Sequence, residues 1–186
     1  MSKVRIGNNV SIPMPVVLVG AIVQGKANFM AVGWISRVNS NPPMIAVGIG
    51  KAKYTQGGIQ EHKTFSVCFP GTDLIAKTDY CGIVSGREKD KSLIFKIFYG
   101  ETQTAPMIEE CPLCLECRLV QNLELPTSTL FVGEIAGAYC EERYLTNGNP
   151  DYRKMNAFLL TMPDNVYWSI GAEVGNALSD GKNLTI

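Results

Sequence analysis

The sequence has a single histidine, His62, among its 186 residues, and it lacks the glycine-rich loops that bind nucleotide phosphates. A Ser-His-Asp or Cys-His hydrolase would have to depend on this one imidazole, which lies in a polar segment. Neither G-x-x-x-x-G-K-S/T nor G-x-G-x-x-G occurs. The sequence therefore lacks the motifs of P-loop nucleotidases and of dinucleotide-binding folds. Adjacent carboxylates such as Glu109 and Glu110 point apart on a strand, which argues against a glycosidase pair. The chain therefore offers no catalytic constellation made of side chains alone.

Neither sign of charge predominates, and no long apolar run is present. The 17 basic residues balance the 17 acidic ones, so net charge provides no general attraction for nucleic acid or an anionic membrane. The apolar run at 16–23 has the length of a strand and falls well short of the roughly 20 residues that span a bilayer. The charged start at 1–5 lacks the features of a signal peptide. We expect a cytoplasmic protein with no nucleic-acid partner and no membrane partner.

Six cysteines are present, at positions 68, 81, 111, 114, 117 and 140. Because 46% of the residues are hydrophobic, a core can form without disulfide bonds, and free thiols are expected. Cys111, Cys114 and Cys117 have a C-x-x-C-x-x-C spacing that suits an iron–sulfur cluster, but Gln121 occupies the position of the fourth ligand. We interpret these cysteines as buried and structural, and we predict no metal. Redox-active thiols and metal ligation are the alternatives.

Apolar patterning predicts a mostly β chain with short helices inserted in the middle. No β-α-β alternation occurs, which argues against a doubly wound sheet. A closed, Greek-key-like antiparallel β-barrel that forms one domain over residues 1–186 fits best, with a bend at Gly133 or Gly137 in the longest strand. Strands are expected at 16–23, 29–37, 44–49, 65–69, 118–125, 130–144 and 157–162; helices are expected at 55–61, from 72 or 73 to 82, near 90 and at the C-terminus.

Two segments resemble the signature of the flavoredoxin branch of the flavin reductase-like proteins. They are Asp79-Tyr80-Cys81-Gly82 with Ser85-Gly86-Arg87-Glu88-Lys89-Asp90-Lys91, and Ala105-Pro106-Met107-Ile108-Glu109-Glu110-Cys111-Pro112 with Glu116-Cys117. The resemblance extends over roughly residues 13–175 and implies the FMN-binding split β-barrel and a homodimer with FMN near the subunit interface. Bound FMN would accept and pass on a hydride or electrons, while the protein supplies position and electrostatics. No catalytic side chain is then required, and we predict none.

The resemblance also assigns the cofactor site position by position. The segment that begins at Asn28 is expected to line the isoalloxazine ring, and Thr55 begins a helix whose N-terminus favours a phosphate. Lys91 is the preferred phosphate-facing cation and Arg87 the second. Ser128 stands where flavoredoxins commonly have a histidine, which leaves a hydroxyl donor without a positive charge. In full, the predicted FMN-binding residues are Asn28, Phe29, Met30, Ala31, Trp34, Ser36, Thr55, Ser85, Arg87, Lys91, Ser128 and Tyr167.

Each assignment has a structural alternative that the residues alone leave open. The segment 28–34 can be an ordinary buried strand, Thr55 a plain helix start, and the run 87–91 a solvated helix start. Tyr167 and its neighbour Trp168 can be core aromatics.

At the level of function, we predict an oxidoreductase. The preferred activity is that of a flavoredoxin-like electron carrier or of an NAD(P)H-dependent flavin reductase, with NAD(P)H or a protein electron donor or acceptor as its partner. Loosely bound flavin that serves as a substrate is a second possibility. The alternative outside redox chemistry is a cofactor-free or flavin-binding barrel without enzymatic activity.

Overall fold

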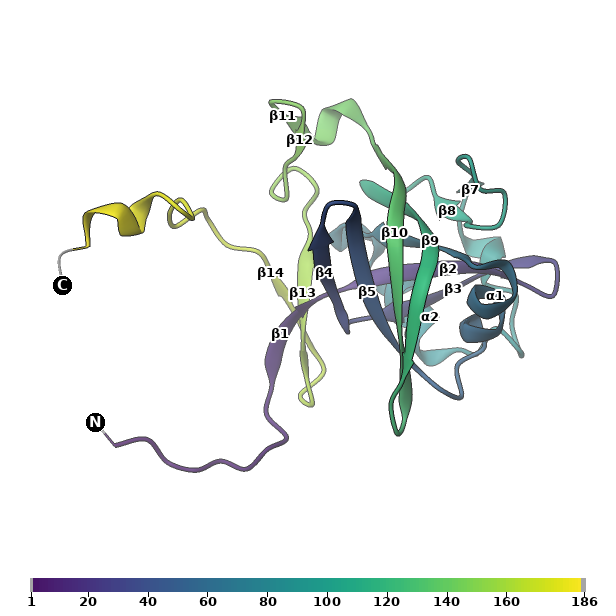
Figure 1. Cartoon of the computed structure of the whole chain (residues 1–186), viewed down its shortest axis with the longest axis horizontal. Coiled ribbons are helices and arrows are strands. Elements are labelled where there is room, and N and C mark those ends of the chain that lie inside the picture. The colour runs from purple at the N-terminus through teal and green to yellow at the C-terminus, as the bar shows by residue number, and fades with distance from the viewer. Residues whose placement is uncertain (1, 185–186) are drawn as a thin grey trace.

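The computed structural model describes residues 2–184, and its main feature is an antiparallel sheet that curls into a barrel (Figure 1). The strands of this sheet are β2 (Val17–Val23), β3 (Lys26–Val32), β4 (Ile35–Ser40), β5 (Pro43–Gly50), β6 (Thr64–Phe69), β9 (Leu113–Glu124) and β10 (Ser128–Cys140). They pair in the order β3-β2-β6-β9-β10-β5-β4. The two edge strands, β3 and β4, are separated in the chain by only Gly33 and Trp34. The edges must therefore lie close together, as in a split barrel, and the mostly β prediction is confirmed.

A second, three-stranded sheet joins the two ends of the chain. It consists of β1 (Ile12–Pro15), β13 (Phe158–Met162) and β14 (Val166–Ser169), in the order β1-β13-β14. Both termini extend away from the barrel on the same side of the molecule (Figure 1). Two short pairs, β7 (Ile97–Phe98) with β8 (Met107–Ile108) and β11 (Leu145–Thr146) with β12 (Asn149–Pro150), complete the strands.

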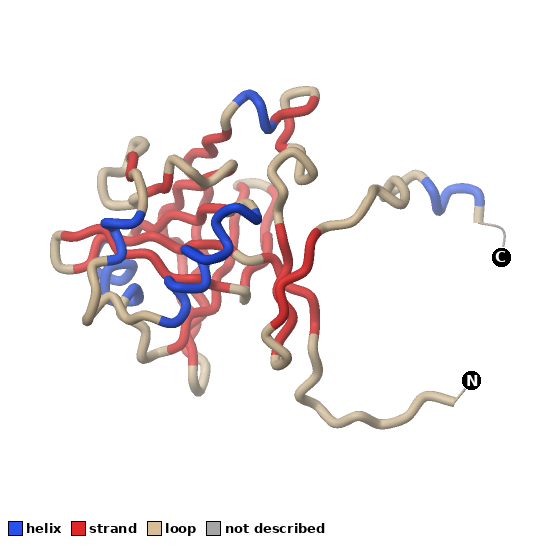
Figure 2. The backbone as a smooth tube through the Cα atoms, turned by 180° about the vertical axis from the view of Figure 1, so that it is seen from behind, coloured by secondary structure: helices blue, strands red, loops and turns tan. Residues whose placement is uncertain are grey.

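The helices are short and lie outside the barrel strands (Figure 2). The α-helices are α1 (Thr55–His62) and α2 (Ile75–Ile83), and 3-10 turns occur at Thr72–Leu74, Lys91–Ile94, Glu142–Tyr144 and Asp180–Asn183. No helix within residues 2–184 is both long enough and apolar enough to cross a membrane.

The position of strand β2 explains why residues 17–23 are almost continuously apolar. Val17 and Val19 belong to the cluster inside the barrel, whereas Leu18 points to a second cluster that includes Phe29 and Cys81. Successive side chains on a strand face opposite sides, so a strand buried on both faces needs apolar residues at every position. Burying each such side chain stabilises the fold by about 1.5–3 kcal/mol.

Two predicted strand boundaries are wrong. The strand expected at 29–37 is interrupted after Val32 because the chain must pass from one edge of the barrel to the other, and Trp34 at this corner is 52% exposed. The strand expected at 118–125 begins at Leu113 instead, where it already pairs with Phe69 of β6. The residues of this first half are buried on both faces, so the alternation that marks a half-buried strand is absent.

The bend predicted in the longest strand is confirmed. The register of β10 against β9 shifts between Val132 and Gly133 and again between Ile135 and Gly137. A Cβ atom on Gly133 would lie 2.6 Å from the ring of Phe65, so the glycine is required there by close packing as well as by curvature. The helix expected from residue 72 also needs correction, since Thr72–Leu74 is a 3-10 turn and α2 begins at Ile75.

Candidate functional site

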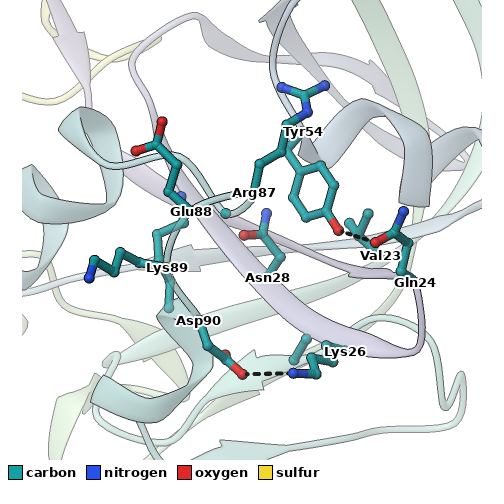
Figure 3. Close-up of a pocket in the computed structure, with 12 residues that line it drawn as sticks. Val23, Gln24, Lys26, Asn28, Tyr54, Arg87, Glu88, Lys89 and Asp90 are labelled. Carbon is teal, nitrogen blue, oxygen red and sulfur yellow. Dashed lines mark hydrogen bonds and ion pairs between the residues drawn. The ribbon is translucent and has the colours of Figure 1, made fainter.

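Two adjoining cavities lie between strand β3, the start of α1 and the loop that follows α2. The first, the Thr55 cavity, has a volume of about 220 Å³ and is lined by Asn28, Met30, Ala52, Lys53, Tyr54, Thr55, Cys81, Gly82, Ile83, Val84, Ser85, Gly86 and Lys91. The second, the Lys89 cavity, has a volume of about 280 Å³ and is lined by Val23, Gln24, Lys26, Ala27, Asn28, Tyr54, Gly86, Arg87, Glu88, Lys89, Asp90 and Lys91 (Figure 3). Segments far apart in the sequence thus converge on one site.

A buried hydrogen bond connects strand β3 to helix α1 at the Thr55 cavity. Asn28 Nδ2 donates to Thr55 Oγ1 at 2.8 Å, and the two residues are only 4% and 1% exposed. Because the Thr55 oxygen accepts this bond, its own proton remains available for an acceptor in the cavity. In the described chain, no side chain caps the start of α1, and the first turn of this helix contains no acidic residue. The helix dipole and the hydroxyl therefore both favour an anion at this point.

Gly86 allows the loop after α2 to lie against Asn28. A Cβ atom at this position would be 2.1 Å from Asn28 Oδ1 and 2.8 Å from the ring of Tyr54, so any larger residue would displace the buried amide. The same loop is held from outside by Arg87, whose Nη1 donates to the Ala52 carbonyl oxygen at 2.9 Å. The Arg87 guanidinium lies 5.3 Å from the centre of the Tyr54 ring, and Figure 3 shows both residues above Asn28. These contacts fix the wall shared by the two cavities.

Lys91 lines both cavities but is already engaged with helix α2. Its Nζ donates to the carbonyl oxygens of Cys81 at 3.2 Å and Val84 at 3.0 Å. Burial lowers the pKa of Lys91, with a rise caused by Cys81 and a further decrease caused by Lys53. An ammonium group has three donors, so one N–H remains beyond the two that cap the helix. Its role as a phosphate-facing cation remains a prediction.

Several predicted residues lie elsewhere. The side chain of Phe29 points away from Asn28, as alternation on a strand requires, and packs edge-on against Phe95 with 5.5 Å between ring centres. Ser36 is exposed and donates to the carbonyl oxygen of Arg37 at 3.1 Å. Within residues 2–184, neither cavity is lined by the following predicted residues: Phe29, Ala31, Trp34, Ser36, Ser128 and Tyr167.

Two of these residues, Ser128 and Tyr167, make contacts that stabilise the fold. Ser128 is buried at the first position of β10, in register with Gly50. Tyr167 donates to Asp79 Oδ1 at 3.0 Å and packs edge-on against Phe158.

Sequence reasoning did not select Lys53, Tyr54 or Gly86, although all three line the Thr55 cavity. Gly86 carried a signal, because it lies within a run of polar and charged residues where a glycine usually marks a turn or a close approach. Tyr54 carried none, since its importance comes from contacts with Arg87 and Gln24, which are distant in sequence. Tyr54 donates its hydroxyl proton to Gln24 Oε1 at 2.9 Å.

Comparison with known proteins identifies the family to which the chain belongs. The profile of the flavin reductase like domain matches residues 10–156, and the chain belongs to this family. It is similar along its full length to the crystal structure of a flavoredoxin from Methanosarcina acetivorans, with 59% identity, complete coverage of both chains and a TM-score of 0.97.

Two further relatives are similar to the chain at lower identity. A flavoredoxin of Desulfovibrio vulgaris (Miyazaki F) is 33% identical, with 98% of this chain and 100% of that chain covered and a TM-score of 0.90. An uncharacterized protein of Archaeoglobus fulgidus is 33% identical over 134 residues, which are 70% of this chain and 75% of that protein. The predicted family and the split-barrel fold are confirmed.

Proposed function

We propose that this protein binds FMN in the Thr55 cavity and acts as a flavoredoxin-like electron carrier or as an NAD(P)H-dependent flavin reductase. The observation that carries the proposal is the convergence of predicted residues from three segments on one cavity at the start of α1. These residues are Asn28, Met30, Thr55, Ser85 and Lys91. The 59% identity with a flavoredoxin over the full chain supports the same conclusion.

The donors around the Thr55 cavity suit the phosphate of FMN. Thr55 and Ser85 provide hydroxyl groups, Lys53 and Lys91 provide positive charge, and α1 contributes its N-terminal dipole. No Asp or Glu side chain of the described residues lines this cavity, so nothing there opposes an anion. Arg87, which lines the adjoining Lys89 cavity and donates to the Ala52 carbonyl oxygen, adds a further positive charge beside the site.

Apolar groups in the same cavity suit the flavin ring. Met30 and Ile83 line it beside the buried amide of Asn28, and ligand pockets usually combine such apolar walls with a few polar groups. When bound, FMN supplies the hydride or electron chemistry. The chain would hold the phosphate, orient the ring and restrict its contact with water.

We also infer a single domain over residues 1–186 that works in the cytoplasm as a homodimer. An apolar groove of about 410 Å³ supports the dimer, because Ile35, Ile45, Phe69 and Leu115 are among the residues that line it. Trp34, half exposed at the adjoining barrel corner, extends the apolar surface. Sedimentation of the purified protein tests this oligomeric state.

The first experiment records the visible absorption spectrum of the protein after gel filtration with FMN, followed by anaerobic addition of NADH. A flavin spectrum retained on the protein is expected. Bleaching by NADH would favour the reductase, whereas an unbleached spectrum that a protein donor can reduce would favour the carrier. Flavin that separates from the protein but is reduced in the mixture would indicate a substrate. A protein that neither retains nor binds FMN would refute the proposal.

The site is tested by titrating FMN into Thr55→Val and Thr55→Ser. Valine keeps the shape but removes the hydroxyl, and loss of a hydrogen bond to a charged group costs about 1–3 kcal/mol, equivalent to roughly five- to hundredfold weaker binding. Serine keeps the hydroxyl and should bind FMN as the parent does. Thr72→Val, at an exposed 3-10 turn outside both cavities, is the matched control. Equal FMN affinity in all variants would show that the phosphate lies elsewhere.

A further inference from the structure

Three cysteines that the flavin proposal does not use lie together on another part of the barrel. Cys68 of β6 and Cys114 of β9 are register partners on adjacent strands, and Cys114 Sγ lies 4.0 Å from the carbonyl oxygen of Cys111. Cys114 Sγ also donates to the carbonyl oxygen of Ile108 at 3.3 Å. All six cysteines of the chain are free thiols. The three residues therefore lie together as free thiols.

The cluster has access to a cavity of its own. This cavity has a volume of about 600 Å³ and is lined by Phe98, Glu109, Cys111, Pro112, Cys114, Tyr139, Cys140 and Glu141. It shares no residue with the Thr55 cavity or the Lys89 cavity. Cys111 and Cys114 are both buried, and Cys111, at 5% exposed, is the more accessible of the two. Cys68 is fully buried behind them.

We propose that Cys111 and Cys114, in the segment Cys111-Pro112-Leu113-Cys114, form a redox-active dithiol that reduces a low-molecular-weight disulfide bound in this cavity. The C-x-x-C spacing brings the two thiols to one site, and both Cys111 and Cys114 line the same cavity. The chemistry is independent of flavin and needs no group other than the disulfide itself.

The exchange consists of two balanced steps. The sulfur of Cys111 attacks one sulfur of the disulfide, so a mixed disulfide forms, the external S–S bond breaks, and the leaving thiolate takes up the Cys111 proton. The sulfur of Cys114 then attacks Cys111 Sγ, which forms the Cys111–Cys114 bond and releases the second thiol with the Cys114 proton. The protein dithiol loses two electrons and two protons, and one disulfide becomes two thiols.

The thiol environment limits how fast this site reacts. Burial raises the pKa of Cys111 well above its ordinary value, and the neighbouring thiols of Cys114 and Cys68 raise it further. Since the thiolate is the attacking species, we expect exchange that is slow at neutral pH and faster as the pH rises.

The cavity lining defines which disulfides fit. Glu109 contributes a carboxylate, whereas the carboxylate of Glu141 is paired with Arg143 at 2.9 Å. Phe98 packs edge-on against Tyr139 with 5.7 Å between ring centres. A disulfide with cationic arms should therefore react faster than an anionic one of similar size. Cystamine and 3,3'-dithiodipropionate form such a matched pair of probes.

The test treats the reduced, native protein with each probe and follows the product by mass spectrometry and peptide mapping. With cystamine we expect loss of two hydrogens and a Cys111–Cys114 bond. Because cysteamine is intrinsically the better leaving thiol, the ratio of the cystamine rate to the dithiodipropionate rate should be several-fold greater than the same ratio measured with a small free thiol. Cys114→Ser should instead accumulate a stable cysteamine adduct on Cys111, and Cys111→Ser should form neither product. Cys117→Ser, whose thiol is buried inside the barrel, is the matched control and should react as the parent does.

Three results would overturn the proposal. Cysteines that react only after denaturation in urea would be structural. A disulfide or adduct that involves Cys140, the third cysteine of the cavity, and not Cys111 would place the reactivity elsewhere. A rate ratio no greater than that of the small free thiol would overturn the assigned charge preference. The native parent protein gives the first two results by itself, so a variant that fails to fold does not prevent the test.

Discussion

At the scale of single residues, Glu116 is the carboxylate with the strongest structural role. Its side chain is fully buried, yet it accepts hydrogen bonds from the backbone N–H groups of Glu101 and Thr102 and from the Tyr139 hydroxyl. Burial raises the pKa of Glu116, but these hydrogen bonds outweigh that effect and the net result is a lowered pKa. The charged form is therefore the one that the fold stabilises, and it ties the loop at 99–104 to strand β9.

Glu116→Gln should lower the free energy of unfolding at neutral pH by about 1–3 kcal/mol. The NH2 group of glutamine can only donate, so it cannot accept the hydrogen bonds that one carboxylate oxygen accepts in the parent. The folded-state pKa lies below the ordinary value of 4.5, so the carboxylate contributes stability above that pH and loses it as the pH falls through the folded-state pKa. The difference between parent and variant should shrink in acid. Urea denaturation at neutral and acidic pH measures it, with the exposed Glu134→Gln as control; a difference independent of pH would contradict this account.

At the scale of elements, helix α1 contains two adjacent glycines with opposite requirements. A Cβ atom on Gly57 would meet nothing within 4 Å, whereas one on Gly58 would lie 2.1 Å from the carbonyl oxygen of Ile22. Gly58 thus allows α1 to approach strand β2, and Gly57 has no such function. Glycine disfavours a helix interior, and packing explains its presence at Gly58 but not at Gly57.

Gly57→Ala should stabilise the protein by roughly 0.5–1 kcal/mol, because alanine restricts the unfolded chain and favours the helix. Gly58→Ala should destabilise it by more than that, since the helix must move away from β2. Thermal unfolding of the two variants provides a matched comparison in which each is the control for the other. Equal shifts of the melting temperature would mean that α1 does not pack on β2 as described.

The sequence predicted the secondary-structure elements better than it predicted the contacts and breaks between them. The doubly buried β2 was recognisable because its apolar run is continuous, and the bend in β10 because Gly133 and Gly137 interrupt an apolar strand. The break at Gly33 was not recognisable, since it arises from closure of the barrel edges. Part of the candidate site followed from motif positions, such as Asn28 and Thr55. The wall made by Tyr54 depends on contacts between distant segments and carried no local pattern.

At the scale of the whole molecule, a hydrogen bond joins the three-stranded sheet to helix α2, which packs on the barrel. Tyr167 of β14 donates to Asp79 of α2. Burial and then this bond raise the pKa of Tyr167 to about 12. Tyr167 is one of the predicted FMN-binding residues, and in the described chain its hydroxyl connects two elements that are far apart in sequence.

The contribution of this bond to stability should depend on pH. Since the folded-state pKa is raised, the stability is fully present below the ordinary pKa of 10 and is lost as the pH rises toward about 12. Tyr167→Phe should be less stable than the parent below pH 10 and should approach it in strong alkali. Ultraviolet titration should also lose its most alkaline tyrosine step in this variant. Retention of that step would assign it to another tyrosine, and the exposed Tyr152→Phe provides the control.

The pairing of β1 with β13 determines the order in which the chain can assemble during synthesis. Residues 12–15 leave the ribosome early, but their register partners are residues 159–162. All seven strands of the barrel have been made once β10 ends at Cys140. The nascent barrel can therefore form before β1 has a partner, and β1 is secured only after the later strand β13 has been made.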